Sequence, residues 1–578
     1  MQVNPLRGRG GVFSTLLILT TILLGFESEA QVSQWSQQAL STQSPPNILL
    51  LMAEDMGPRV GAFGDPVAVT PNIDALAERG TRYTAAFTAS GVCAPSRAAL
   101  LTGMHPISIG AQHMRTSSSP DGEYLSVPPH YVKAFPELLR AAGYYTFTDG
   151  KLDYQFSGAL SGSGPSSIWN IEEGDAYWEG RSEKSQPFFG LINLMETHES
   201  GVFTQLFEAW PHSFMHFLMQ GVRAFLFDIP IDGGTVQAEE VVVPPYYPDT
   251  KTVRSDLARH YKNIQFMDAR VGEILTRLRA DGLAESTIVI WTTDHGDGLP
   301  RGKRDLYDSG IKVPLVIYWP DRFRPGWLAA GEIDERLISF VDLAPTLMQL
   351  AGLQVPPHFQ GKSFVENDPK FRDYVFASRD RIDDVDDRER AVRDQRYKYI
   401  RSWYPDRANG HPSDFRDNLE IMRELWEMLG RDELNPAQQI WFQPTGAERL
   451  YDLRTDPYEL KNLASDPLHA STLERMRGAY AEWRRRVPDW SDEPEHEMME
   501  RMWPSRKKPR TEAPQFSYKG NQILMISPTV GASIVYRVGE GHWQVYREPV
   551  QVEEGDILRA RAVRYGYAES EEVERILR

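Results

Sequence analysis

Short apolar segments of strand length recur along this chain, with helical patterns between them. Residues 47–53 form a continuous apolar run, as expected at the buried centre of a parallel sheet. Residues 187–194 form a second such run, and residues 287–293 form a third that is rich in β-branched side chains. Between the last two lies a long amphipathic pattern over 254–278 with helical spacing. This alternation predicts an α/β domain with a mostly parallel central sheet flanked by helices.

Charged or metal-capable side chains follow four predicted strands, the three apolar runs and a short strand at 144–147. In a doubly wound sheet the carboxyl ends of parallel strands lie at one edge, where such folds bind ligands. One charged strand end is unremarkable, but four together predict a convergent polar site at that edge. The side chains concerned are Glu54 and Asp55, Lys151 and Asp153, His198, and Asp294 and His295.

The chain has a single cysteine, Cys93, which therefore cannot form an internal disulfide. Residues 96–101 are good helix formers, and Pro95 suits the first helical position. Cys93 is thus expected just before a helix N-terminus, where unpaired amides and the helix dipole favour negative charge. A buried, inert thiol is the ordinary alternative for a lone cysteine.

The order Cys-x-Pro-Ser-Arg followed by Leu-Thr-Gly resembles the signature of type I sulfatases, which belong to the alkaline phosphatase superfamily. Cys93, Pro95, Arg97, Leu101 and Gly103 stand where that motif has them. The resemblance implies that a maturation enzyme converts the cysteine to formylglycine, whose hydrated aldehyde is the nucleophile. It extends over about residues 46–487, and the Met-Glu-Thr-His-Glu-Ser context is nearest to the heparan N-sulfatase branch.

Oxygen ligands dominate the predicted metal site. Glu54, Asp55 and Asp294 offer carboxylates, and His295 adds one imidazole. Such a set suits a hard cation, Ca²⁺ or Mg²⁺, better than zinc. The resemblance implies one Ca²⁺ that is bound by these residues and by the formylglycine at Cys93. Glu54 is a departure, because the commoner family member has aspartate there.

The resemblance also implies roles for the basic residues. Arg97 steadies the formylglycine hydrate, while Lys151 and Lys303 hold the sulfate. His198 corresponds to the histidine that donates a proton to the leaving atom. Such cations offset the charge of an anionic ester in a partly dehydrated pocket.

Substrate contacts are expected from residues around this centre. Many sulfatases have histidine where this chain has Asp153, so we expect Asp153 to contact a substrate hydroxyl or amine, with His295 or His198 as the base. The segment that contains His113 and Arg115 is expected to reach the site and contact the sugar.

The N-terminal residues are typical of a secretory signal peptide. Arg7 and Arg9 precede an apolar run at 12–24, and small residues at 28–30 form a cleavage site. We therefore expect residues 1–30 to be removed and the protein to be exported, periplasmic or secreted. The mature chain shows no further apolar run long enough to be a transmembrane segment. A formal charge of −17 argues against nucleic acid as a partner.

Four further units follow from the pattern along the 578 residues. The catalytic α/β domain is expected over 46–375 and a small antiparallel C-terminal subdomain over 376–487. A charged, proline-bearing linker is expected over 488–513. Short alternating strands over 514–573 predict a β-sandwich, which resembles the accessory module of chitobiase-type enzymes.

Residues 202–227 carry an apolar stripe at helical spacing. Such a stripe is consistent with three alternatives: a packed helix of the core or an interface, a lid over the pocket, and an interfacial membrane helix. Packing is favoured, because the polar face has few of the lysines and arginines that membrane-surface helices use.

These observations together predict a sulfatase that hydrolyses a sulfate ester or sulfamate on a sulfated carbohydrate, with formylglycine and Ca²⁺. A phosphonate or phosphate monoester hydrolase of the same superfamily is the enzymatic alternative. A catalytically inactive glycan-binding protein is the alternative of another class.

Overall fold

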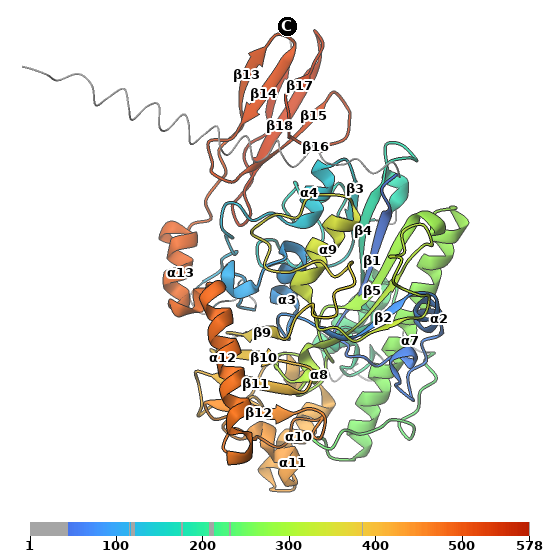
Figure 1. The fold of residues 1–578 in the computed structure, drawn as a ribbon, viewed down its shortest axis with the longest axis vertical. Coiled ribbons are helices and arrows are strands. Elements are labelled where there is room, and N and C mark those ends of the chain that lie inside the picture. Colours follow the sequence, from blue (N-terminus) through green and yellow to red (C-terminus); the bar gives the residue numbers. More distant parts are fainter. Residues whose placement is uncertain are drawn as a thin grey trace, which may run out of the picture.

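The computed structural model describes residues 44–114, 116, 119, 122–174, 177–206, 213–230, 233–383 and 385–576. Within these ranges an eight-stranded mixed sheet forms the centre, in the order β3-β4-β1-β5-β6-β2-β7, with β8 paired to β2 (Figure 1). The sheet confirms the predicted α/β class. Its strands are β1 (Asn47–Ala53), β2 (Thr81–Phe87), β3 (Tyr145–Thr148), β4 (Phe188–Leu194), β5 (Thr287–Thr293), β6 (Lys312–Tyr318), β7 (Ile333–Asp334) and β8 (Ile338–Ser339).

Helices cover both faces of this sheet because its strands are apolar on both sides. Along β1, Leu49 and Leu51 belong to one core, while Ile48 and Leu50 belong to the other. The first core receives α2 (Pro71–Arg79) and α7 (Lys251–Ala280). The second receives α3 (Cys93–Thr102), α4 (Phe135–Ala141) and α9 (Leu343–Leu350). Strands β3, β4, β1 and β5 run parallel, so their carboxyl ends share one edge.

A second, antiparallel sheet has the order β12-β11-β10-β9. It lies beside the helix α12 (Ala470–Arg486), whose buried side chains Met476 and Tyr480 share a core with Val392 and Tyr399 of the sheet (Figure 1). Its strands are β9 (Val375–Arg379), β10 (Glu389–Arg393), β11 (Tyr397–Ser402) and β12 (Glu448–Asp452). The short helices nearby are α8 (Asp308–Ile311), α10 (Glu420–Gly430) and α11 (Pro436–Gln439).

Two small sheets at the C-terminal end of the described chain form the expected sandwich, at the top of Figure 1. One has the order β13-β14-β17 and the other β16-β15-β18-β19. Ile523 and Met525 of the first pack against Ile534 and Leu558 of the second. The strands are β13 (Gln515–Lys519), β14 (Gln522–Ile526), β15 (Ser533–Val538), β16 (Gln544–Val545), β17 (Val550–Gln551), β18 (Ile557–Val563) and β19 (Val573–Ile576).

The segment 488–513, expected to be a linker, contains the packed helix α13 (Glu495–Met502). Its Met498, Met499 and Met502 are buried in a cluster that includes Tyr124. The apolar periodicity of this helix is carried by methionines among charged residues, which is why the segment looked irregular in sequence.

The apolar stripe expected over 202–227 falls partly outside the described residues, and the described helix is α6 (Phe214–Leu226). Its polar residues Gln220 and Arg223 face inward, while Phe214 and Phe225 are 66% and 82% exposed. Within α6 the apolar stripe therefore faces away from the core, whereas Phe203 and Leu206, earlier in the segment, are buried. Among the described residues, no helix combines the length and apolar character that a membrane span requires.

Candidate active site

The loops that follow β1, β3, β4 and β5 meet beside the N-terminus of α3. Adjacent strands hold these loops in register, since Glu54 N donates to Leu194 O at 3.2 Å and Asp294 N donates to Ala53 O at 3.1 Å. Nearly all of the side chains concerned are fully withdrawn from solvent. Ten of the predicted site residues are connected here by hydrogen bonds or ion pairs. They are Glu54, Asp55, Cys93, Arg97, Lys151, Asp153, His198, Asp294, His295 and Lys303.

Cys93 is the first residue of α3, two positions earlier than the start that Pro95 suggested. Its Sγ lies 3.3 Å from His295 Nε2 and 3.8 Å from Asp55 Oδ1, and the residue is fully buried. Gly91 allows this approach, because a Cβ there would come within 2.3 Å of the Asp305 carbonyl oxygen. The chain therefore presents Cys93 at a helix N-terminus in contact with a carboxylate and an imidazole.

Four side chains form a group that could bind a metal ion: Asp55, Cys93, Asp294 and His295, whose ligand atoms lie within 4.8 Å of one another. His295 Nδ1 lies 3.0 Å from the Gly296 carbonyl oxygen, which can only accept, so Nδ1 carries a proton. In the neutral ring the lone pair is then on Nε2, which faces Asp55 Oδ1 at 3.0 Å. An imidazole lone pair beside two carboxylates suits a cation.

The electrostatics of this group favour bound positive charge. Burial alone would lower the pKa of His295, but Asp294, Cys93 and Asp55 raise it well above its usual value. Burial would raise the pKa of Asp294, but His295 and Arg97 bring it down to about 2. The carboxylates are therefore ionised at neutral pH.

Glu54 lies beside this group and is paired with cations instead. Arg97 Nη2 donates to Glu54 Oε1, and Lys151 Nζ lies 2.5 Å from Glu54 Oε2. Burial raises the pKa of Glu54, and the two cations oppose that effect. The longer side chain of glutamate, compared with aspartate, thus reaches the basic residues.

Basic side chains also surround Asp55, the second of the two carboxylates that follow β1. Lys303 Nζ lies 2.7 Å from Asp55 Oδ2 and 3.3 Å from Glu199 Oε1. Arg304 forms a two-pronged pair with Glu199, with both distances 2.8 Å. Burial would lower the pKa of Lys303, but Asp55, Cys93 and Glu199 raise it, so this lysine stays charged. Lys303 is therefore held at the edge of the metal-capable group.

His198 presents a protonated Nε2 toward the same centre. The Ser200 backbone N–H donates to His198 Nδ1 at 3.4 Å, and an N–H can only donate, so Nδ1 is the acceptor. The proton of the neutral ring is then on Nε2, which lies 3.9 Å from Asp55 Oδ2. Burial lowers the pKa of His198 well below its usual value. The ring is neutral and offers one N–H.

Three residues of the site have backbone angles that side chains rarely adopt. The φ angles of Asp55, Asp153 and Arg304 are 48°, 55° and 81°. Such conformations persist where the surrounding contacts hold them, and they concentrate at functional sites. Asp153 Oδ2 lies 3.9 Å from Lys151 Nζ, so this strained turn brings a second carboxylate to the lysine.

Of the two residues that were expected to contact the sugar, His113 and Arg115, the structure describes only His113. Arg115 lies outside the described residues. His113 is buried, and its Nδ1 lies 3.7 Å from Glu495 Oε2 of α13, rather than joining the ion pairs around Cys93. Its neighbour Met114 packs with Cys93 and Ile382, so this segment forms an apolar wall of the site.

Several residues that build the site were missed in the sequence. Asn193 Oδ1 accepts from Arg97 Nη1 at 2.7 Å, and its Nδ2 donates to the Lys151 carbonyl oxygen at 2.9 Å. Thr197 Oγ1 binds both backbone groups of Glu54. A buried amide inside an otherwise apolar strand was the available signal for Asn193. Glu199 had no signal beyond its place after His198.

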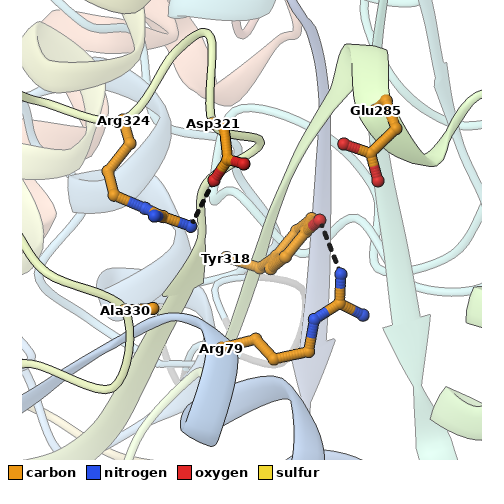
Figure 2. Close-up of a pocket in the computed structure, with 6 residues that line it drawn as sticks. All are labelled: Arg79, Glu285, Tyr318, Asp321, Arg324 and Ala330. Carbon is orange, nitrogen blue, oxygen red and sulfur yellow. Dashed lines mark hydrogen bonds and ion pairs between the residues drawn. The ribbon is translucent and has the colours of Figure 1, made fainter.

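A pocket lies at the end of the central sheet opposite to the predicted site (Figure 2). It has a volume of about 300 Å³, and Figure 2 shows Arg79 directed at Tyr318 and Arg324 at Asp321. Glu285, which also lines it, lies just before β5, whereas the predicted site follows β5. None of the predicted site residues lines this pocket.

The fold and the site together define a class of protein: an α/β protein with a mostly parallel central sheet and a metal-capable acidic centre at the carboxyl edge of that sheet. The sulfatase family model matches residues 46–353, and the chain belongs to the sulfatase family. The model described as "N-sulphoglucosamine sulphohydrolase, C-terminal" matches residues 301–434.

Named relatives agree with this assignment. An ulvan-active sulfatase of Formosa agariphila is 37% identical over 92% of this chain and 91% of its own length. The N-sulphoglucosamine sulphohydrolase of Homo sapiens is 28% identical over 80% of this chain and 94% of its own length. The phosphonate monoester hydrolase of Agrobacterium radiobacter shares the fold, with a TM-score of 0.50 at 21% identity over 76% of this chain and 96% of that one.

Proposed function

We propose that this sulfatase hydrolyses a sulfate ester or sulfamate on a sulfated carbohydrate. The observation that carries the proposal is the meeting of nine acidic, basic and imidazole side chains around Cys93. Two relatives with substrates in their names support the carbohydrate, since one is named for ulvan and the other for N-sulphoglucosamine. The bond cleaved is S–O in an ester and S–N in a sulfamate.

In this proposal a maturation enzyme converts Cys93 to formylglycine, whose hydrated aldehyde supplies the nucleophilic oxygen. Arg97 lies one helical turn after position 93, and its guanidinium bridges Glu54, Asn193 and Asp294. Three neighbours hold it rigidly, so its charge is fixed beside the reacting group. Asp294, ionised and 3.4 Å from Arg97, is available to accept a hydroxyl proton.

The residues fit a Ca²⁺ ion, which supplies Lewis acidity toward a sulfate oxygen when bound. Asp55, Asp294 and His295, together with position 93, would hold it, because they offer ionised oxygens and one imidazole lone pair. Glu54 was predicted as a fifth ligand; its two oxygens face Arg97 and Lys151, so its part is to hold these cations.

The basic residues would bind the sulfate group, and His198 would protonate the leaving atom. Lys151 and Lys303 stand on either side of the acidic centre and would hold the sulfate oxygens. As the imidazolium, which forms when Nδ1 takes up a proton from solvent, His198 would donate its Nε2 proton to the departing oxygen or nitrogen and return to the neutral ring. Asp153 would contact a sugar hydroxyl or amine, which fits a buried Oδ2 that accepts no hydrogen bond from the described residues.

The proposal also covers the domains of the chain and its N-terminal segment. Residues 46–375 and 376–487 would form the catalytic unit, and residues 514–573 would be an accessory module. Residues 1–30 would be a signal peptide, so that the enzyme reaches polysaccharide outside the cytoplasm. Contact of His113 and Arg115 with the sugar stays a prediction.

The test combines protein chemistry with substrate assays. In protein from the native source, the peptide that carries residue 93 should show the mass of formylglycine and react with a hydrazide. The enzyme should release sulfate from ulvan or heparan oligosaccharides, and Cys93→Ala should not. An intact thiol in native protein, or faster cleavage of nitrophenyl phosphonate than of any sulfate, would overturn the proposal.

A further inference from the structure

A second cavity, of about 530 Å³, lies behind the loop that carries His198. Its described walls come from α6, from α7, from residues 201–206 and from residues 229–230 and 233–238. The volume falls in the range of ligand pockets, and Phe266, Ile229 and Val236 give it an apolar side. It is separate from the centre around Cys93, because none of the ten site residues lines it.

The polar lining of this cavity is cationic and amide-rich. Among the described lining residues three are basic and none is a carboxylate, although acidic residues outnumber basic ones by 80 to 63 in the chain. Arg259 is neutralised by Glu420 at 3.1 Å. Arg223 and Lys262 have no carboxylate within 4.0 Å among the residues the structure describes, so the described lining of the cavity is positively charged, which Glu196 offsets in part at Arg223.

The floor of the cavity has an unused hydrogen-bond donor. Asn263 is 6% exposed, and its Nδ2 has no hydrogen-bond partner within the described part of the chain. Asn263 Nδ2 and Arg223 Nη2 converge over Gly201, since a Cβ on that glycine would lie 2.6 Å and 2.4 Å from them. A buried amide donor beside an arginine lacks an acceptor, and an anion oxygen would satisfy both.

The same floor supports the loop of the reaction site. Arg223 donates to the carbonyl oxygens of Met195 and Glu196, at 3.3 Å and 2.9 Å. Gln220 donates to the Ser200 carbonyl oxygen at 2.8 Å. These carbonyls flank His198, so the cavity lies against the back of the loop whose front faces Asp55.

We propose that this cavity binds an anionic group, sulfate or carboxylate, of a saccharide, apart from the group that reacts at position 93. The inference deepens the proposed function and rests on it for the saccharide, while the charge, the unused donor and the apolar wall belong to the cavity itself. Lys262 and Asn263 would bind the anion, and Phe266 would pack against the sugar ring.

The test is calorimetric titration of full-length Cys93→Ala protein, which binds without turnover. The titrants are N-acetylglucosamine 6-sulfate, glucuronic acid, inorganic sulfate and uncharged N-acetylglucosamine. We expect two classes of site for the sulfated sugar and binding of the uncharged sugar to neither. Comparison of the glucuronic acid and inorganic sulfate titrations shows whether a carboxylate or a free sulfate ion enters the cavity.

Variants then assign the second class of site. Adding Lys262→Glu or Asn263→Ala should weaken that class about tenfold or more, the loss of a hydrogen bond to a charged group. Lys262→Arg should retain it. Lys251→Glu, the same charge reversal at the exposed start of α7, is the matched control and should leave both classes unchanged.

A single class of site in Cys93→Ala protein, or a second class that survives both cavity substitutions, would overturn the inference. The proposed function fails differently. If wild-type enzyme releases no sulfate from any saccharide while the cavity variants still lose a binding class, then the cavity binds anions and the catalytic proposal is wrong.

Discussion

Removal of the His198 imidazole should affect carbohydrate sulfates far more than activated aryl sulfates. In the structure the Ser200 N–H fixes the tautomer, so that Nε2–H faces the centre. A sugar oxygen is a poor leaving group and needs that proton, whereas nitrophenolate departs without it. His198→Ala therefore removes proton donation while leaving the basic residues that hold the sulfate.

The expected size of the loss in His198→Ala follows from the role of His198 as a general acid. General acid catalysis contributes about 10²–10⁴-fold, so kcat/KM on a sulfated oligosaccharide should fall by that factor. On nitrophenyl sulfate the fall should stay within about tenfold, since the contact of His198 with the acidic centre, at 3.9 Å to Asp55, is weak. Both substrates are assayed at saturating Ca²⁺, and released sulfate and nitrophenol are measured over a range of pH.

Two controls separate proton donation from general damage. His469→Ala removes a half-exposed imidazole that pairs with Asp466 and should leave both rates unchanged. Ser200→Ala removes the hydroxyl that lies 2.9 Å from His198 Nδ1 but keeps the backbone N–H that donates to it, so it should preserve the tautomer and cost far less than His198→Ala. An equal fall on both substrates for His198→Ala would refute the reasoning and make His198 a binding or structural residue.

Three further predictions concern stability and the metal. Glu54→Gln should lower the free energy of unfolding by about 3 kcal/mol, because Arg97 and Lys151 lose a buried carboxylate, while Ca²⁺ affinity measured by titration changes little; a large loss of affinity would make Glu54 a ligand. Glu495→Gln should cost about 3 kcal/mol at pH 7, because it breaks the buried pair with Arg381. Burial would raise the pKa of Glu495, but Arg381 holds it below the usual 4.5, so the carboxylate stabilises the fold above that pH. The difference between wild type and Glu495→Gln in urea unfolding should therefore shrink as the pH falls below 4.5, and a constant difference would contradict this account. Removal of metal with a chelator should abolish sulfate release and lower the unfolding temperature, and Ca²⁺ should restore both; activity that persists in metal-free enzyme would argue against a catalytic ion.

The sheet and the edge at which the site lies followed from the sequence because their signals are local. The apolar run that ends in Glu54 and Asp55 can be recognised from the sequence alone, and so can the motif around Cys93. Parallel pairing of β1 with β4 and β5 then brings the strand ends together.

What the sequence could not supply are contacts between distant segments. Glu495 lies 114 positions after Arg381, and neither residue indicates the other. The pairing of Glu54 with Arg97 and Lys151 could not be read from the sequence either, because side-chain length and neighbouring cations decide where its oxygens point, while its role as a ligand stays a prediction. Asn193 was hidden inside an apolar strand, because a buried amide is identified as structural only when its partners are known.

If Cys93 is oxidised to formylglycine as proposed, its complete burial sets an order of events during biosynthesis. An enzyme that oxidises this thiol cannot reach it once α3 has docked and Met114 and Ile382 have closed over it. Arg381, next to Ile382, is anchored by Glu495, which leaves the ribosome some 400 residues after Cys93. Because α13 is synthesised late, the Cys93 thiol of the nascent chain would stay accessible to the modifying enzyme until then.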